Sequence, residues 1–263
     1  MSYRALAAFP FVLVLMAVGL VAAVPASAHP VLLRVLVEVA KVLALIGLGA
    51  AALVFAPGDY LRRGYGLHAL CYALLLSRDL WFYATIGAPA GVVEVGRGVF
   101  IALANVAVVA GTWTLARAWG MAGLELPGSS TLRRVALVLA VGASLLFAGP
   151  AVLVDARLSV GHPDHLWAVI SDLGDLLALP VLAPVALTAI AVRSGTLRWP
   201  WALLTGSLLS WLLYDAVLSL PDLLHVADSS PFRLVGEQFR LFAATSAFAA
   251  GLAQKRAVRE LEG

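Results

Sequence analysis

The chain has 263 residues, of which 62% are hydrophobic and only 13% are charged. This composition excludes an ordinary soluble domain and is typical of a membrane protein with several spans. The net charge of +3 comes mainly from arginines in short segments between apolar runs, without the Lys/Arg clusters of nucleic-acid-binding proteins. We therefore expect the lipid bilayer as a partner and no nucleic acid. The single cysteine, Cys71, excludes an internal disulfide and a cysteine zinc site.

The N-terminal segment has two interpretations. Arg4 precedes an apolar run over residues 5–23, and Ala26-Ser27-Ala28 then fits the small-residue pattern of a signal-peptidase site. Residues 1–28 are therefore predicted to be a signal peptide. The run is longer than the usual apolar region of about 7–15 residues, so an additional transmembrane helix is the alternative.

Seven further apolar runs are each close to the roughly 20 residues that a helix needs to cross a bilayer. Short segments connect them, so neighbours in sequence are expected to be antiparallel neighbours in space. The sequence predicts an all-α fold, a polytopic bundle of seven transmembrane helices over residues 29–254 with a short cytoplasmic tail at 255–263. The predicted spans are Val31–Phe55, Gly66–Ile86, Val93–Ala116, Val135–Val154, Leu166–Val192, Pro200–Leu220 and Phe232–Leu252.

The distribution of basic residues predicts the orientation of these spans. The segments after the first, third and fifth spans and the C-terminus are rich in Lys and Arg, whereas the opposite segments carry little beyond Arg157 and Arg233. Because cytoplasmic loops carry an excess of basic residues, the seven-span core is predicted to begin outside and to end in the cytoplasm. The basic residues of the cytoplasmic side are Arg62, Arg63, Arg117, Arg133, Arg134, Arg193, Arg198, Lys255, Arg256 and Arg259.

Ionisable residues from six of the seven spans fall in one layer. With a rise of about 1.5 Å per residue, that layer is the outer half of the membrane. The inner halves offer hydroxyl groups such as those of Thr112, Thr188 and Thr205. This pattern predicts an outward-facing polar pocket above an apolar floor. The residues expected to bind a ligand there are Glu38, Lys41, Asp79, Arg97, Asp172, Asp175, Trp211, Tyr214, Asp215, Glu237 and Arg240.

Asp172 and Asp175 are the most informative pair in this layer. Their spacing places both carboxylates on one face of a helix, about 8 and 12 Å below the outer boundary of the span. No basic residue lies within the same span. Since a charge in hydrocarbon costs several kcal/mol, an ionisable residue inside a span is a candidate functional residue. Asp172 and Asp175 are therefore the candidate catalytic residues if the protein is an enzyme.

A structural network of salt bridges is the alternative interpretation of this layer. Its acidic and basic residues nearly balance, and buried charges in membranes pair with one another. Glu237 and Arg240, three residues apart on one predicted helix, have the spacing of such a pair.

Three histidines are candidates for metal binding. His162 and His165 have a compatible spacing, and His225 is predicted on the same side of the membrane. The HExxH signature of zinc enzymes is absent, and histidines in loops are commonly solvated surface residues. The sequence therefore predicts no metal, and it assigns no cofactor.

Three functions fit these observations. The first is the binding of a small polar ligand or a lipid head group in the outer pocket, in a receptor-like or accessory role. The second is an intramembrane enzyme that acts on lipid at the outer leaflet, with Asp172 and Asp175 as general acid and base. The third is a proton-coupled transporter, which needs access from both sides of the membrane. The predicted last span has no lysine, which excludes the retinal Schiff base that microbial rhodopsins carry there.

Overall fold

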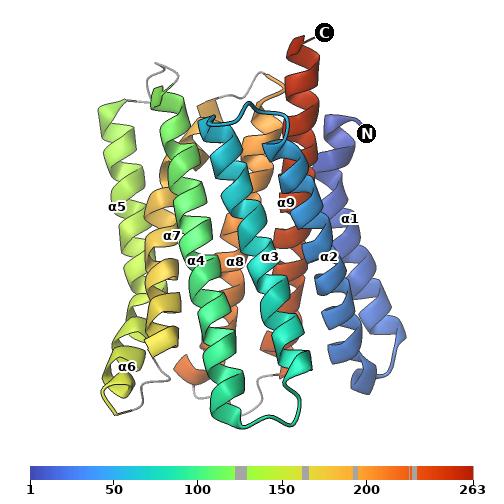
Figure 1. The fold of residues 1–263 in the computed structure, drawn as a ribbon, viewed down its shortest axis with the longest axis vertical. Helices are drawn as coiled ribbons and strands as arrows, with labels where there is room; N and C mark the ends of the chain where they lie inside the picture. Colours follow the sequence, from blue (N-terminus) through green and yellow to red (C-terminus); the bar gives the residue numbers. More distant parts are fainter. Residues whose placement is uncertain (122–128, 162–165, 192–194, 225, 227–229, 263) are drawn as a thin grey trace. The chain divides into compact units, whose positions relative to one another are not determined.

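The computed structural model describes residues 1–121, 129–161, 166–191, 195–224, 226 and 230–262. Within these ranges the fold is all-α, 89% helical and without strands, as the composition predicts (Figure 1). The chain packs as two compact units. Unit 1 comprises Met1–Val54 and Val192–Gly263, and unit 2 comprises Phe55–Ala191.

Unit 1 is organised around its last helix. It contains α1 (Tyr3–Ala23), the short 3-10 turn η1 (Ala26–Ala28), α2 (His29–Ala52), α8 (Arg198–Leu223) and α9 (Ser230–Glu262). Helix α9 contacts the other three α-helices of this unit and lies beside α1 and α2 in Figure 1. Its buried side chains are mainly small, which lets neighbouring backbones approach closely. The alanines of α9 that are fully buried are Ala243, Ala244, Ala247, Ala249, Ala250, Ala253 and Ala257.

Helices α2 and α9 approach each other closely at Gly47 and Gly251. A Cβ atom at Gly251 would lie 2.2 Å from the carbonyl oxygen of Gly47. A Cβ atom at Gly47 would lie 2.6 Å from the carbonyl oxygen of Phe248. Because backbone atoms occupy both places, only glycine fits without a shift of one helix. This crossing holds together the two helices that carry Glu38, Lys41, Glu237 and Arg240.

Unit 2 contains α3 (Tyr60–Ala84), α4 (Ala90–Met121), α5 (Ser130–Phe147), α6 (Gly149–Ser159) and α7 (Leu166–Ala191). Helix α4 packs against α3 and α7, and α7 also contacts α5 and α6. Side-chain caps begin two of these helices, since each satisfies a free backbone N–H group of the first turn. Asp59 accepts a hydrogen bond from Leu61 N at 2.7 Å, and Ser129 accepts one from Leu132 N at 3.1 Å.

The predicted fourth span, Val135–Val154, is not a single helix. Helix α5 ends at Phe147 and α6 begins at Gly149. Pro150 lies in the first turn of α6, where it has no N–H group to continue the hydrogen-bond ladder of the preceding helix. The short helix α6 then packs against α7, and its Asp155 interacts with Asp172 on α7.

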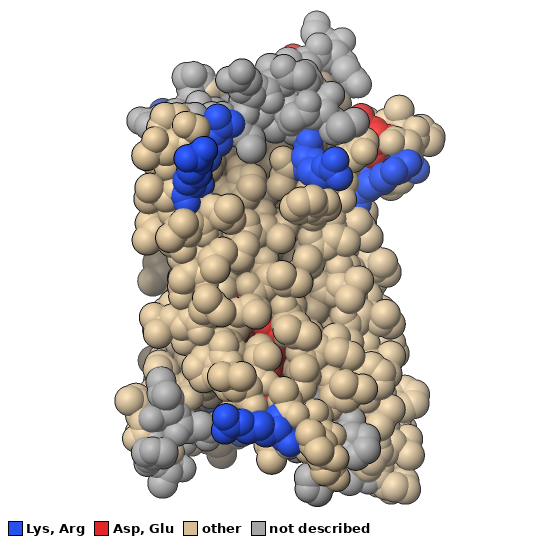
Figure 2. Space-filling model, turned by 90° about the vertical axis from the view of Figure 1, so that its left-hand side faces the viewer, with Lys and Arg blue, Asp and Glu red and all other residues tan. Residues whose placement is uncertain are grey.

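Five helices in the described ranges are long and apolar enough to cross a membrane: α1, α4, α5, α7 and α8. They agree with the predicted class of protein, whereas the count of seven spans is not confirmed. The other three long helices each carry charged residues within their length, such as Lys41 in α2, Arg78 in α3 and Arg240 in α9. On the face drawn in Figure 2, Lys and Arg lie near the two ends, and mostly uncharged residues cover the part between.

Helix α1 is packed against the rest of unit 1. Leu6, Pro10 and Ala17 are buried, and the ring of Phe9 lies 5.6 Å from the ring of Phe248, centroid to centroid. The Tyr3 hydroxyl donates a hydrogen bond to Glu260 Oε2 at 2.8 Å. The first residues of α1 and the last residues of α9 therefore lie at the same end of unit 1 (Figure 1).

Candidate functional site

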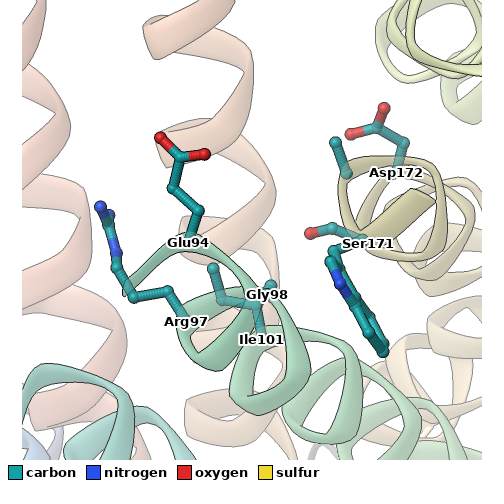
Figure 3. Close-up of a pocket in the computed structure, with 8 residues that line it drawn as sticks. Glu94, Arg97, Gly98, Ile101, Ser171 and Asp172 are labelled. Carbon is teal, nitrogen blue, oxygen red and sulfur yellow. The ribbon is translucent and has the colours of Figure 1, made fainter. Parts of the chain in front are cut away.

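A pocket of about 490 Å³ lies between α4 and α7 in unit 2 (Figure 3). Its volume is within the range of roughly 300–1,000 Å³ that is usual for small-molecule sites. One wall comes from the first turns of α4 and the other from the first turns of α7. The residues that line it are Glu94, Arg97, Gly98, Ile101, Trp167, Ala168, Ser171 and Asp172.

Close packing of α4 against α7 positions the two walls. A Cβ atom at Gly98 would lie 2.5 Å from Cβ of Trp167, so the glycine allows the Trp167 turn of α7 to approach α4. Farther along both helices, Nδ2 of Asn105 donates to the carbonyl oxygen of Ser171 at 3.1 Å and to its Oγ at 3.0 Å. Gly174 accommodates this amide, because a Cβ atom there would lie 2.8 Å from Cβ of Asn105. These contacts set the separation of the pocket walls.

Asp172 is the acidic centre of the α7 wall. Its Oδ2 atom is buried, and no described residue donates a hydrogen bond to it. The carboxyl group of Asp155 on α6 comes within hydrogen-bonding reach of Asp172, and Asp175 places another carboxyl group nearby. A second carboxyl group can donate a hydrogen bond to a carboxylate only when it carries a proton. The geometry therefore suits either one proton held between two acids or a cation held by them.

The α4 wall contributes charges of both signs. Glu94 and Arg97 are exposed and extend from the same part of α4, as Figure 3 shows. The guanidinium carbon of Arg97 lies 5.3 Å from the centroid of the Phe82 ring on α3, within the range of a cation–π contact. The pocket thus places one cation and two acidic side chains, Glu94 and Asp172, around a common space.

Two of the predicted ligand-binding residues in unit 2 line this pocket, and two do not. Arg97 and Asp172 line it, and Asp175 lies close to Asp172 without forming the wall. Asp79 is instead paired with the preceding residue in α3, since its Oδ1 lies 2.6 Å from Nη2 of Arg78.

The predicted residues on α2 form an ion pair in unit 1. Nζ of Lys41 lies 2.8 Å from Oε1 of Glu38, one turn earlier in the same helix. The Lys41 side chain is 0% exposed. A buried charge needs such a partner, because isolation from water would otherwise be costly. The structural interpretation of this pair is thus supported, and its part in ligand binding stays a prediction.

The predicted residues on α8 and α9 include a second ion pair. Nη1 of Arg240 lies 2.8 Å from Oε1 of Glu237. The guanidinium carbon of Arg240 also lies 6.0 Å from the ring of Trp211 and 5.1 Å from the ring of Tyr214. Asp215 follows Tyr214 directly in α8. These residues hold α8 against α9, and their binding role also stays a prediction.

Several pocket residues were not among those predicted from the sequence. Ser171 begins the acid-bearing stretch of α7, and Glu94 precedes Arg97 by three residues, so both shared a helical face with a predicted residue. Trp167 had no such signal, because a tryptophan near the end of a span is usual at the membrane surface. The approach of Asp155 depends on the break between α5 and α6, which the predicted single span did not contain.

The metal candidates His162, His165 and His225 lie outside the described residues. Among the residues that the structure does describe, no group of three or more His, Cys, Asp and Glu side chains could hold a metal ion.

A comparison of the chain with models of known protein families, with curated proteins and with solved structures finds no match. The function of the pocket is therefore inferred from the chemistry of its lining residues.

Proposed function

We propose that the protein is an integral membrane protein that binds a zwitterionic ligand, such as a phospholipid head group, in the α4–α7 pocket. Its role is receptor-like or accessory. The observation that carries the proposal is the presence of both signs of charge around one cavity of about 490 Å³. Glu94 and Asp172 attract an ammonium group, and Arg97 attracts a phosphate or carboxylate.

The remaining lining residues support a ligand with both charges. Trp167 and Ile101 provide apolar surface for the methylene groups that separate an ammonium from a phosphate. An indole face also attracts cations. A ligand with one charge would interact with the acidic side chains or with Arg97, whereas a zwitterion interacts with both.

The orientation in this proposal follows from the arginine distribution. The C-terminus is cytoplasmic, and the pocket opens on the extracytoplasmic side. We propose that α2, α3 and α9 also span the membrane, because each carries ion pairs that reduce the cost of its charges. The seven-span core and α1 then make an even number of crossings. This number agrees with the contact between Tyr3 and Glu260 at one end of unit 1.

Of the two interpretations of residues 1–28, we propose the additional transmembrane helix. Leu6 and Ala17 of α1 are only 2% and 1% exposed. Phe11 packs edge-on against Phe242 of α9, with 4.9 Å between ring centroids. Removal of α1 uncovers this apolar surface of α9, so retention is favoured by the packing of the unit.

The binding proposal is tested with glycerophosphoethanolamine, a soluble zwitterionic head group, by calorimetric titration of the purified protein in detergent. Asp172→Asn and Arg97→Gln are each expected to weaken binding by about ten-fold or more, since each removes a charged hydrogen-bonding partner worth roughly 1.5–3 kcal/mol.

Asp79→Asn is the matched control, because Asp79 is an acid of the same predicted layer that does not line the pocket. It is expected to leave the affinity unchanged. Equal weakening by Asp79→Asn and Asp172→Asn contradicts a site at this pocket. Tighter binding of glycerophosphate, which lacks the ammonium group, contradicts a zwitterionic ligand.

A second candidate function is an enzyme that acts on lipid at the outer leaflet. The approach of Asp155 to Asp172 favours it, since a proton shared by two acids makes one a general acid and the other a general base. Asp155 replaces Asp175 in this role. Release of a head group or fatty acid from added phospholipid, lost in Asp155→Asn while binding is retained, distinguishes this function from binding alone.

Proton-coupled transport is a third candidate. It needs a path from the pocket through the inner half of the membrane. Thr188 on α7 is only 1% exposed, and its hydroxyl donates to the carbonyl oxygen of Pro184 in the same helix. This packing favours ligand binding over transport. A pH change inside liposomes that contain the protein, on addition of ligand, would favour transport instead.

A further inference from the structure

A second cavity lies in unit 1, where α1 begins and α9 ends. Its volume is about 450 Å³. The walls combine cationic and apolar side chains. They are formed by Met1, Leu6, Leu252, Lys255, Arg256, Arg259 and Glu260.

The cations of this cavity are unequally paired. Nε of Arg256 donates to Oε1 of Glu260 at 2.6 Å, Nη1 donates to the carbonyl oxygen of Met1, and the guanidinium carbon lies 4.7 Å from the Tyr3 ring. Lys255 and Arg259 form no ion pair or hydrogen bond with any residue that the structure describes. Among the lining side chains, three cations and one carboxylate leave an excess of two positive charges.

Two general roles of basic residues do not account for this arrangement. Lys and Arg in the last turns of a helix offset its dipole, and basic residues near span ends determine topology. Neither role requires that the cations surround a cavity or that another helix closes it. Here α1 forms one side, and the interaction of Arg256 with Glu260 and Met1 fixes that side against α9.

The apolar part of the cavity favours an anionic ligand that also has a hydrocarbon part. Leu6 is 2% exposed, and Leu252 is half-buried, so the cations lie beside hydrocarbon rather than open water. A small inorganic anion uses only the cations. A phospholipid phosphate also places its glycerol and first acyl carbons against the leucines, and basic pockets between membrane helices are known to hold such head groups.

We propose that Lys255 and Arg259 bind a phosphate group in this cavity, carried by an anionic phospholipid of the cytoplasmic leaflet. The site rests on the retention of α1 and on a cytoplasmic C-terminus. It is independent of the ligand of the α4–α7 pocket, so either site can fail alone. Arg256 is a positioning residue, because Glu260 neutralises it and it connects α9 to the chain before α1.

The test measures lipid retention by native mass spectrometry of the full chain, released from micelles that contain equal amounts of phosphatidylglycerol and phosphatidylcholine. We expect preferential retention of phosphatidylglycerol. Lys255→Gln and Arg259→Gln together should reduce this preference by roughly five-fold for each charge removed.

The matched control is Arg133→Gln with Arg134→Gln at the start of α5, which removes the same charge on the same predicted side of the membrane. An equal loss of preference in this control overturns the proposal, because general surface attraction then explains the binding. Protection of wild-type thermal stability by inorganic phosphate as strong as that by the lipid overturns the assignment to a lipid.

Discussion

Asn105 on α4 donates two hydrogen bonds to a single residue of α7, one to Oγ and one to the carbonyl oxygen of Ser171, at 3.0 and 3.1 Å. Polar contacts between membrane helices contribute on average about 0.6 kcal/mol each, with a maximum near 1.7 kcal/mol. This pair connects the two walls of the α4–α7 pocket at one point.

The first prediction concerns these two bonds. Asn105→Ala removes both and should lower the midpoint of thermal unfolding in detergent by about 2–4 °C, on the basis of roughly 1 kcal/mol in total. Ser171→Ala removes only the bond to Oγ and should cost less. Ser77→Ala is the control, because that hydroxyl donates within its own helix to the carbonyl oxygen of Ala73. A loss in Ser77→Ala as large as that in Asn105→Ala contradicts the assignment.

A second prediction contrasts two glycines of unit 1. Gly251→Ala places a methyl group against the backbone of Gly47 and should destabilise the protein by about 1–3 kcal/mol, as overpacking does. Gly49→Ala meets no atom within 4 Å and should be neutral or stabilising by up to about 1 kcal/mol, from helix propensity. Thermal unfolding of both variants, followed by circular dichroism, measures the difference. If Gly251→Ala does not lower stability, α2 and α9 lie farther apart at this point than the structure shows.

The topology gives a third prediction. A reporter that is active only outside the cytoplasm should be inactive when fused after Gly263 and active when inserted at Pro163, in the segment 156–165. Arginine asymmetry between alternate segments is the reason. The reverse pattern of activity contradicts both the orientation and the outward opening of the α4–α7 pocket.

The N-terminal helix gives a fourth prediction. The intact mass of the purified protein should include residues 1–28, because α1 buries Leu6, Pro10 and Ala17 in unit 1. Leu6→Asp should then destabilise the purified protein, whereas Leu15→Asp, at a position 70% exposed, should affect membrane insertion without the same loss of packing. A mass that begins after Ala28 excludes retention.

Acid should loosen the contact between α1 and α9. The pKa of Glu260 lies below its usual range because Arg256 and, to a smaller extent, Tyr3 donate hydrogen bonds to it. This contribution to stability is present above the unfolded pKa of about 4.3 and is lost as the pH falls through the lower folded value. Hydrogen exchange in the first turns of α1, corrected for the intrinsic effect of pH, should therefore rise in acid. Glu260→Gln should abolish that dependence.

Local features of the site were predictable from the sequence, and tertiary ones were not. Glu38 with Lys41 and Glu237 with Arg240 form ion pairs because residues three apart are neighbours on any helix. The approach of Asp155 to Asp172 requires the break between α5 and α6 at Ala148. The hydrophobic periodicity of the sequence does not specify the direction in which the chain turns there. The division into two units also escaped prediction, since unit 1 joins the first and last parts of the chain through α1 and α9.

The two prolines inside α7 give this helix uneven stiffness. Pro180 and Pro184 have no N–H group, so the carbonyl groups of Leu176 and Pro180 lose their usual partners in the helix. The segment from Trp167 to Asp172 lies before this interruption. The part of α7 that forms the pocket wall is therefore stiffer than the part around Pro180 and Pro184. A ligand that draws the two pocket walls together therefore tilts the segment of α7 before Pro180 as a rigid body. The helix then bends mainly near Pro180.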